Sequence, residues 1–174
     1  MTARQKAEAS EAIRRRLAHL PEWQAADTVM LFLSMPDEVD TRPIVRDALA
    51  AGKTVCVPKV DRRRKTMDCR ALTSLETGLA AGVFGILEPV ADEIVEPGAI
   101  DFVLVPARGF DRQGNRLGRG GGYYDRYMAQ PDFTALRCGI AFAAQLLDDL
   151  PHDETDLPVQ LIVTEDDALR CAGA

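Results

Sequence analysis

The chain has 174 residues, enough for one domain whose core hides roughly 70% of the unfolded surface without a disulfide or a structural metal. Its net charge of −6 argues against a nucleic-acid backbone as the general partner, because such binding needs a basic face. No apolar run approaches the ~20 residues of a membrane helix, and the N-terminus lacks the apolar core of a signal peptide, so we expect a cytoplasmic protein with neither a membrane nor a nucleic-acid partner.

The N-terminal part of the chain predicts helices and strands in alternation. A helix is expected over residues 7–19, where apolar residues recur at helical spacing and acidic residues precede basic ones, in the order that the helix dipole favours. The continuous apolar run at residues 28–33 is typical of a parallel strand that is covered on both faces. A second helix is expected over residues 41–51, with Thr41 as its N-cap and Gly52 just beyond its end.

The rest of the chain continues this alternation and predicts the fold class. A helix opens in a glycine-rich segment and runs through Tyr127, and further strands are expected at residues 54–58, 67–71, 101–105, 137–142 and 161–164. This order favours an α/β fold: a single three-layer domain over residues 1–174, with a largely parallel, Rossmann-like sheet flanked by helices. Ligands of such folds bind beyond the carboxyl ends of the strands, so we expect the segments at residues 34–41 and after Pro106 to share one site.

The cysteines and histidines argue against both a disulfide framework and a zinc site. His19 and His152 lie far apart in the sequence, and neither stands at a ligand spacing typical of zinc. The cysteines have no C-x-x-C spacing and mostly fall in or beside apolar runs, at Cys56, Cys69, Cys138 and Cys171. We therefore expect reduced, mostly buried thiols, as in a cytosolic protein.

The segment at residues 106–127 combines glycines with arginines and closes on two tyrosines and a carboxylate. Glycines expose backbone N–H groups to an anion, arginines supply positive charge and a carboxylate can hold a metal ion, so the composition indicates a phosphate site. The segment does not match the dinucleotide pattern G-x-G-x-x-G, because Tyr123 takes the third glycine position. Residues 52–54 do not complete a Walker A loop, because Asp47 takes the place of its first glycine. On composition alone, a surface turn remains the alternative for residues 106–127.

Three other polar features have mainly structural interpretations when they are considered alone. Glu38 is typical of a solvated carboxylate or of a cap partner for the helix that follows it. The basic run at residues 62–65 is typical of an exposed turn between two strands, and its functional interpretation is the docking of an acidic substrate tail. Asp156 is ambiguous.

Four segments occur in the order and with the residues of a known family. Residues 106–126 are similar to the signature P-x-x-x-F-D-x-x-G-x-R-L-G-x-G-x-G-Y-Y-D, and residues 85–89 to a G-I-x-E-P stretch. Residues 32–41 are similar to a folate-side segment and residues 156–165 to a closing strand. Together they resemble the 5-formyltetrahydrofolate cyclo-ligase family, also called methenyltetrahydrofolate synthetases. The resemblance covers nearly the whole chain, and the long signature is far more specific than a lone glycine motif.

The resemblance implies an enzyme, a ligase that forms a cyclic C–N bond with Mg²⁺ and with ATP as co-substrate. It would convert 5-formyltetrahydrofolate, with or without a polyglutamate tail, to 5,10-methenyltetrahydrofolate and release ADP and phosphate. Transfer of the γ-phosphoryl group to the formyl oxygen makes an iminium phosphate, which N10 of the folate attacks before phosphate departs. The protein would align the reactants and neutralise developing charge. We expect it to act as a monomer.

The resemblance also implies roles for individual residues. Glu38 would accept hydrogen bonds from pterin N–H groups beside Leu33, and Asp125 and Asp156 would hold Mg²⁺, which takes oxygen ligands. The residues that would cradle ATP are Arg116, Leu117, Gly118, Arg119, Gly120, Gly121, Gly122, Tyr123 and Tyr124. The residues that would also touch the folate are Arg119, Gly120, Gly121, Gly122 and Tyr123, and the catalytic residues would be Arg116, Arg119 and Tyr123.

Three departures from the family pattern matter for ATP binding. By this resemblance the chain is expected to start after the basic N-terminal helix with a K-x-x-x-R pattern that is usual in the family, and Arg4 and Lys6 do not stand at matching positions. Gly121 stands where some members have lysine, and Gln160 where aspartate is common. The main alternative is therefore a folate- or nucleotide-binding relative with weak or no turnover. A sugar-phosphate isomerase is a further alternative, against which the long signature and Glu38 argue.

Overall fold

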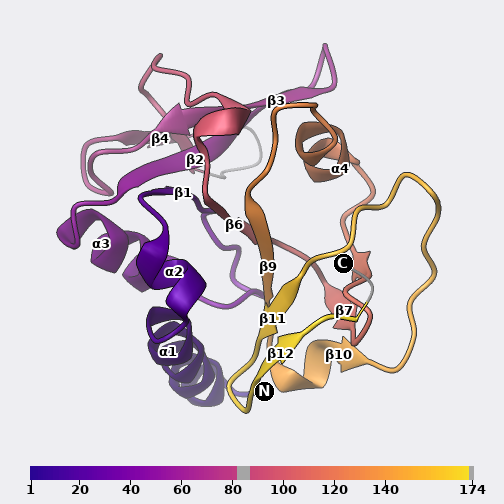
Figure 1. Ribbon diagram of the computed structural model, residues 1–174. Coiled ribbons are helices and arrows are strands. Elements are labelled where there is room, and N and C mark those ends of the chain that lie inside the picture. The colour runs from indigo at the N-terminus through magenta and orange to yellow at the C-terminus, as the bar shows by residue number, and fades with distance from the viewer. Residues whose placement is uncertain (82–86, 173–174) are drawn as a thin grey trace.

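The computed structural model describes residues 1–81 and 87–172 and is built around one large sheet (Figure 1). In this part of the chain the sheet has seven strands in the order β12-β11-β9-β6-β1-β2-β3. The neighbouring strands from β11 to β2 run parallel, and the edge strands β12 and β3 run antiparallel to their neighbours. The strands are β1 (Thr28–Met30), β2 (Thr54–Asp61), β3 (Thr66–Ala71), β6 (Phe102–Val105), β9 (Leu136–Ile140), β11 (Leu161–Val163) and β12 (Ala168–Arg170).

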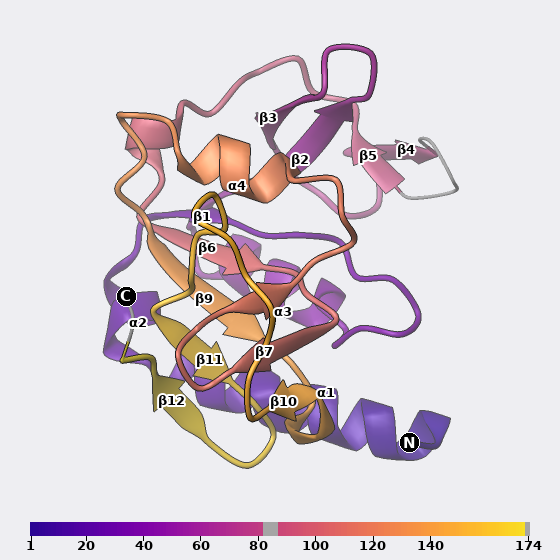
Figure 2. The same cartoon turned by 90° about the vertical axis from the view of Figure 1, so that its right-hand side faces the viewer.

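Helices cover both faces of this sheet because its strands are apolar on both faces; β6 and β11 are buried at every residue. On one face lie α1 (Ala3–Ala18), α2 (Pro21–Ala25) and α3 (Arg42–Ala50), which pack Ile13, Trp23 and Val45 against the sheet. On the other face α4 (Tyr123–Met128) packs Tyr127 and Met128 (Figure 2). The predicted three-layer α/β fold with a largely parallel sheet is confirmed.

A small sheet packs on the same face of the central sheet as α4 and carries part of the glycine-rich segment. Its strands are β7 (Gly109–Asp111), β8 (Arg116–Leu117) and β10 (Leu146–Leu147), in the order β10-β7-β8. Phe110 of β7 packs so closely on β9 that a Cβ atom at Gly139 would lie 2.5 Å from its ring. Glycine at position 139 therefore lets the small sheet dock on the central one. A separate hairpin pairs β4 (Leu79–Ala81) with β5 (Leu87–Pro89), and short 3-10 helices cover Pro97–Ala99 and Ala143–Gln145.

Several predicted boundaries differ from the structure. The first helix begins at Ala3, because Thr2 and Gln5 form a capping box ahead of the predicted start. The strand predicted at residues 28–33 ends at Met30, and the one at residues 137–142 is β9, which ends at Ile140. The strand predicted at residues 54–58 continues to Asp61, where the basic turn joins it to β3.

The predicted N-cap of α3 is confirmed at Thr41, but its side chain makes no capping hydrogen bond. Thr41 is the N-cap residue, but its buried hydroxyl donates to the carbonyl oxygen of Phe32 at 2.6 Å and accepts from the backbone N–H of Ser34 at 3.0 Å. The hydroxyl thus closes the loop that follows β1 instead of satisfying the helix. Thr41 consequently fixes the shape of a segment that the sequence assigns to the site.

Two composition-based expectations concern cysteines and membrane spans. Cys56, Cys69 and Cys138 are buried and Cys171 is half-buried, and all four thiols are free, as predicted. Among the residues that the structure describes, none of the helices is long and apolar enough to cross a membrane.

Candidate active site

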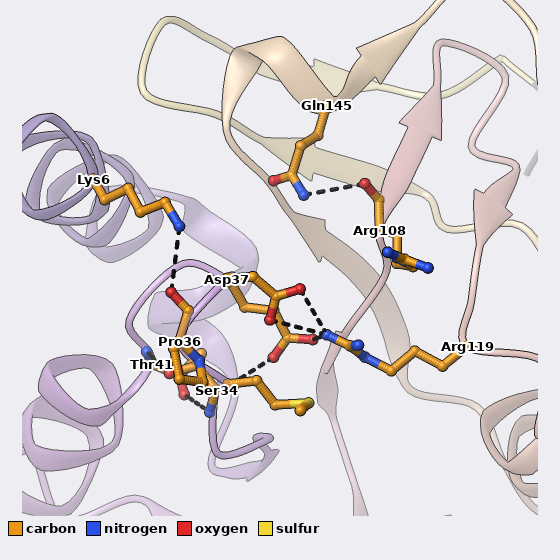
Figure 3. Close-up of polar contacts among 10 residues, drawn as sticks. Lys6, Ser34, Pro36, Asp37, Thr41, Arg108, Arg119 and Gln145 are labelled. Carbon is orange, nitrogen blue, oxygen red and sulfur yellow. Dashed lines mark hydrogen bonds and ion pairs between the residues drawn. The ribbon is translucent and has the colours of Figure 1, made fainter. Parts of the chain in front are cut away.

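The loop that follows β1 is ordered by its own carboxylate. Glu38 accepts a hydrogen bond from the backbone N–H of Met35 at its Oε2 atom, at 2.8 Å, while its own N–H donates to the carbonyl of Met35 at 3.0 Å. Its side chain is only 11% exposed, so one carboxylate oxygen is committed to the loop and the other is directed to a partner outside it. Lys6 of α1 also reaches this loop and donates to the carbonyl of Pro36 at 3.4 Å (Figure 3).

Arg119 joins this loop to the glycine-rich segment, although the two lie 81 residues apart in the sequence. Its Nη2 atom lies 3.1 Å from Oε1 of Glu38 and 3.1 and 3.2 Å from the two carboxylate oxygens of Asp37 (Figure 3). The hydrogen bond to Glu38, reinforced by Asp37, raises the pKa of Arg119. Burial alone would raise the pKa of Asp37, but hydrogen bonds from its own backbone and from Arg119 outweigh burial and leave that pKa lowered. The two loops that the sequence places in one site therefore meet there.

The glycine-rich turn at residues 118–122 presents backbone N–H groups. None of the amides from Gly118 to Gly122 donates a hydrogen bond to another residue that the structure describes. Gly120 and Gly122 have φ angles of +80° and +60°, in the left-handed region that favours glycine. Consecutive amides in such alternating conformations form a concave nest with a preference for anions. The turn is therefore suited to an anionic ligand.

Arg116 and Asp125 lie behind this turn and form an ion pair. The side chain of Arg116 is 7% exposed and that of Asp125 is 14% exposed. Oδ1 of Asp125 accepts from Arg116 and also from the backbone N–H of Leu157, at 3.0 Å. The Nε atom of Arg116 is buried without a hydrogen-bond partner among the described residues, and so is the hydroxyl of Tyr124. Burial raises the pKa of Tyr124 well above its usual value, which keeps this phenol neutral.

The two carboxylates that the sequence assigns to a metal lie on neighbouring segments. Asp125 bonds to the backbone of Leu157, the residue next to Asp156, and Asp156 in turn accepts from the N–H of Asp153 at 2.9 Å. Each carboxylate uses one oxygen in these bonds, and its other oxygen has no hydrogen bond to any described residue. Mg²⁺ is commonly held by one or two carboxylates together with phosphate oxygens and water, so this donor set fits that ion. Within the described ranges there is no cluster of three or more His, Cys, Asp or Glu side chains.

Comparison with known proteins identifies the family. The sequence model of the 5-formyltetrahydrofolate cyclo-ligase family matches residues 1–165. The chain belongs to this family. It is 34% identical over 155 residues to the 5-formyltetrahydrofolate cyclo-ligase of Mus musculus, covering 83% of this chain and 76% of the mouse protein. It is 31% identical over 167 residues to the enzyme of that name from Escherichia coli (strain K12), covering 94% of this chain and 92% of the bacterial protein.

Solved structures agree with the family. The NMR structure of Aquifex aeolicus 5,10-methenyltetrahydrofolate synthetase superposes with a TM-score of 0.86 at 34% identity, over 100% of this chain and 87% of that one. A 5,10-methenyltetrahydrofolate synthetase from Mycoplasma pneumoniae has a TM-score of 0.75 at 23% identity, over 95% of this chain and 90% of that one, and shows the same fold.

Part of the cyclo-ligase signature is scaffold, since the Phe, Asp and Gly of its F-D-x-x-G portion are buried. Asp111 is fully buried and accepts hydrogen bonds from the N–H groups of Gln113, Asn115 and Leu150, at 2.9–3.2 Å. Gly114 has a φ angle of +94°, and a Cβ atom there would lie 2.2 Å from a backbone oxygen. These residues shape the turn between β7 and β8 and so aim Arg116 at Asp125.

The remaining predicted site residues are less informative, and some contributors are not evident from the sequence. Leu33 packs at the edge of the core, Leu117 is 44% exposed and Tyr123 is half-buried. The G-I-x-E-P stretch begins outside the described residues. Arg108, which follows β6, helps to lower the pKa of Asp37 through its positive charge. The position of Arg108 just past the carboxyl end of a buried strand could have predicted its place in the site.

Proposed function

We propose that this protein is a 5-formyltetrahydrofolate cyclo-ligase, which converts 5-formyltetrahydrofolate to 5,10-methenyltetrahydrofolate and splits ATP to ADP and phosphate. The observation that carries the proposal is the contact of Arg119 with Glu38, because it puts the anion-binding turn and the predicted pterin carboxylate in one site. Family membership supports the same reaction. Glu38 without the adjoining amides of residues 118–122 would not bring ATP and the folate together.

The chemistry needs a protein that aligns two polar reactants. A formamide oxygen is a poor leaving group, and transfer of the γ-phosphoryl group of ATP to this oxygen turns it into a good one, with ADP as the first product. N10 of the folate then attacks the formyl carbon, the C–O bond breaks, phosphate leaves and the N10 proton is lost. Positioning and charge neutralisation supply most of the catalysis in phosphoryl transfer.

We assign the reactants to the two loops. Glu38 accepts hydrogen bonds from the pterin N–H groups and Leu33 packs against the ring, while the amides of residues 118–122 and Arg116 hold the ATP phosphates. Arg119 and Tyr123 lie where the two reactants meet, and Arg119 neutralises charge that develops on the transferred group. The other residues that the resemblance assigns to ATP binding, between Leu117 and Tyr124, shape the turn.

Asp125 and Asp156 would hold Mg²⁺ through their unpartnered carboxylate oxygens. The bound ion supplies positive charge that offsets the charge of the phosphates. Arg116 sits beside Asp125 and orients that carboxylate before the metal-nucleotide arrives.

The test is a direct assay. Purified protein with Mg²⁺-ATP and 5-formyltetrahydrofolate should form a product that absorbs in the near ultraviolet, where the formyl substrate does not, and product should be absent without ATP. ATP-dependent release of ADP in equal amount should accompany it. The absence of both products, with tight folate binding by calorimetry, would favour a binding relative with weak or no turnover.

We further propose that the protein acts as a cytoplasmic monomer on the folate with or without a polyglutamate tail. Free, mostly buried thiols are typical of a reducing compartment, which supports the location. Size-exclusion chromatography with light scattering should give the chain mass of 19.0 kDa across the concentrations of the assay. A mass of twice that value would replace the monomer with a dimer.

A further inference from the structure

Arg126 connects three segments around the glycine-rich turn. Its Nη2 atom donates to the carbonyl oxygen of Gly121 at 2.8 Å, and its Nε atom donates to the carbonyl oxygen of Lys65 at 3.1 Å. Its guanidinium carbon also lies 5.1 Å from the ring centre of Tyr123, within the range of a cation–π contact. One exposed side chain on α4 thus spans from the β2–β3 turn to the site.

The bond to Gly121 fixes the direction of one peptide group. In a trans peptide the C=O of one residue and the N–H of the next point in opposite directions. Because Arg126 holds the Gly121 carbonyl on its own side, the N–H of Gly122 is directed to the opposite side, where no described residue accepts from it. Rotation of this peptide would exchange an amide hydrogen for a carbonyl oxygen on the face that is proposed to receive phosphate.

The glycines at this point make room for the contact. A Cβ atom at Gly122 would lie 2.8 Å from Nη1 of Arg126, and Gly122 has a φ angle of +60°. A Cβ atom at Gly121 would lie 2.7 Å from the ring of Tyr123. Glycine in these positions therefore serves the packing of Arg126 and Tyr123 against the turn, in addition to leaving space for a ligand.

The other end of the contact is rigidly held. Lys65 has a φ angle of 55° in a turn that Asp61 orders, since its Oδ1 atom accepts from the N–H groups of Arg63 and Arg64 at 2.9 and 3.1 Å. Asp61 pairs with Thr66 at the end of the β2–β3 ladder. The carbonyl of Lys65 is thus fixed to the edge of the central sheet.

We propose that Arg126 is a positioning residue that holds the Gly121–Gly122 peptide in its anion-binding orientation by tying it to the β2–β3 turn. The inference rests on the proposed function of the turn at residues 118–122 as the ATP site. Arg126 acts through this peptide, so its effect falls on the nucleotide and spares the folate.

Three variants test this role. Arg126→Ala should raise both KM for ATP and the calorimetric Kd for Mg²⁺-ATP without folate by about threefold to tenfold, with KM for the folate and the melting temperature unchanged. Arg126→Lys, which can reach only one carbonyl at a time, should fall between Ala and wild type. Arg170→Ala, which removes an exposed arginine paired with Glu22, is the matched control and should leave both KM values unchanged.

A double-mutant cycle tests the mechanism. Gly122→Ala displaces the guanidinium and also strains the backbone at a φ of +60°, so its effect on the Kd for ATP should be smaller in an Arg126→Ala background by the part that runs through Arg126. Independent, multiplying effects would overturn the coupling through this peptide. Equal increases in both KM values, or a lowered melting temperature for Arg126→Ala and Arg126→Lys alike, would show a merely structural role. Wild-type protein without ATP-dependent product would instead refute the proposed function, while the ATP titration would still report on Arg126.

Discussion

At the scale of single residues, the proposed site is divided between two ligands, and variants of Glu38 and Arg116 should distinguish them. Glu38→Gln should weaken folate binding by ~1.5–3 kcal/mol, or roughly tenfold to more than a hundredfold in Kd, because a charged acceptor is lost. ATP binding by the free enzyme should stay unchanged or become slightly tighter, because Arg119 loses a competing partner. Arg116→Ala should weaken ATP and spare the folate. Calorimetry with each ligand alone measures both, and equal weakening by Glu38→Gln would mean that the loop has moved.

Asp125 also has a structural role that the sequence does not predict. The motif suggests that Asp125→Asn removes a metal ligand and leaves stability unchanged, but Asp125 also pairs with the buried Arg116 and accepts from Leu157. We therefore expect the variant to lose activity and about 1–3 kcal/mol of unfolding free energy. Asp156→Asn is the control, because it should raise the Mg²⁺ requirement with little change in melting temperature. Equal melting temperatures for the two variants would contradict the double role of Asp125.

At the scale of elements, the basic turn between β2 and β3 lies next to the proposed nucleotide turn, because Arg126 contacts both. If its cations dock an acidic tail, Arg63→Ser with Arg64→Ser should raise KM for a polyglutamylated folate several-fold and leave the monoglutamate unchanged, since each exposed charge contributes up to about 1 kcal/mol. The effect should shrink at high salt. Arg15→Ser on α1 is the control. An equal ratio of KM for the polyglutamylated folate to KM for the monoglutamate in the wild type and in both variants would show that the turn has a purely structural role.

The elements that the sequence predicts well are those with strong apolar patterns. β6 and β11 are continuous apolar runs, and α3 has a clear apolar face, so periodicity is enough. β7, β8 and β10 were missed because strands of two or three residues have no period to detect. At the site, the signature predicts the phosphate turn, whereas the contact of Arg119 with Glu38 depends on a fold that brings distant segments together.

At the scale of the whole molecule, the buried thiols should make the free energy of unfolding decrease as the pH rises into the alkaline range. Burial raises the pKa of Cys69 and Cys138, and raises that of Cys171 to about 11. A raised folded-state pKa gives stability that is complete below the unfolded pKa of about 8.5 and is lost as the pH rises toward the folded value. Above pH 8.5 the unfolding free energy should therefore fall by up to about 1.4 kcal/mol per pH unit for Cys69 and again for Cys138.

Urea unfolding at pH 7.5 and 9.5 measures this loss. Cys138→Ala should remove the contribution of one thiol to the change of unfolding free energy with pH. It should also lower the unfolding free energy at both pH values, because it leaves a cavity, and the two effects can be measured separately. Half-buried Cys171 should add a smaller part because solvent screens it. A flat profile between the two pH values would show that the thiols do not titrate on unfolding.

The contact between Arg119 and Glu38 also bears on the order in which ligands arrive. In the free protein, the cation assigned to phosphate and the carboxylate assigned to the pterin satisfy each other. A phosphate that draws Arg119 away leaves Glu38 free to accept from the pterin, and a pterin that engages Glu38 releases Arg119. Thermodynamic linkage makes the two effects equal. We therefore expect ATP and folate to bind with positive cooperativity, each ligand increasing the affinity for the other by the same factor whichever binds first.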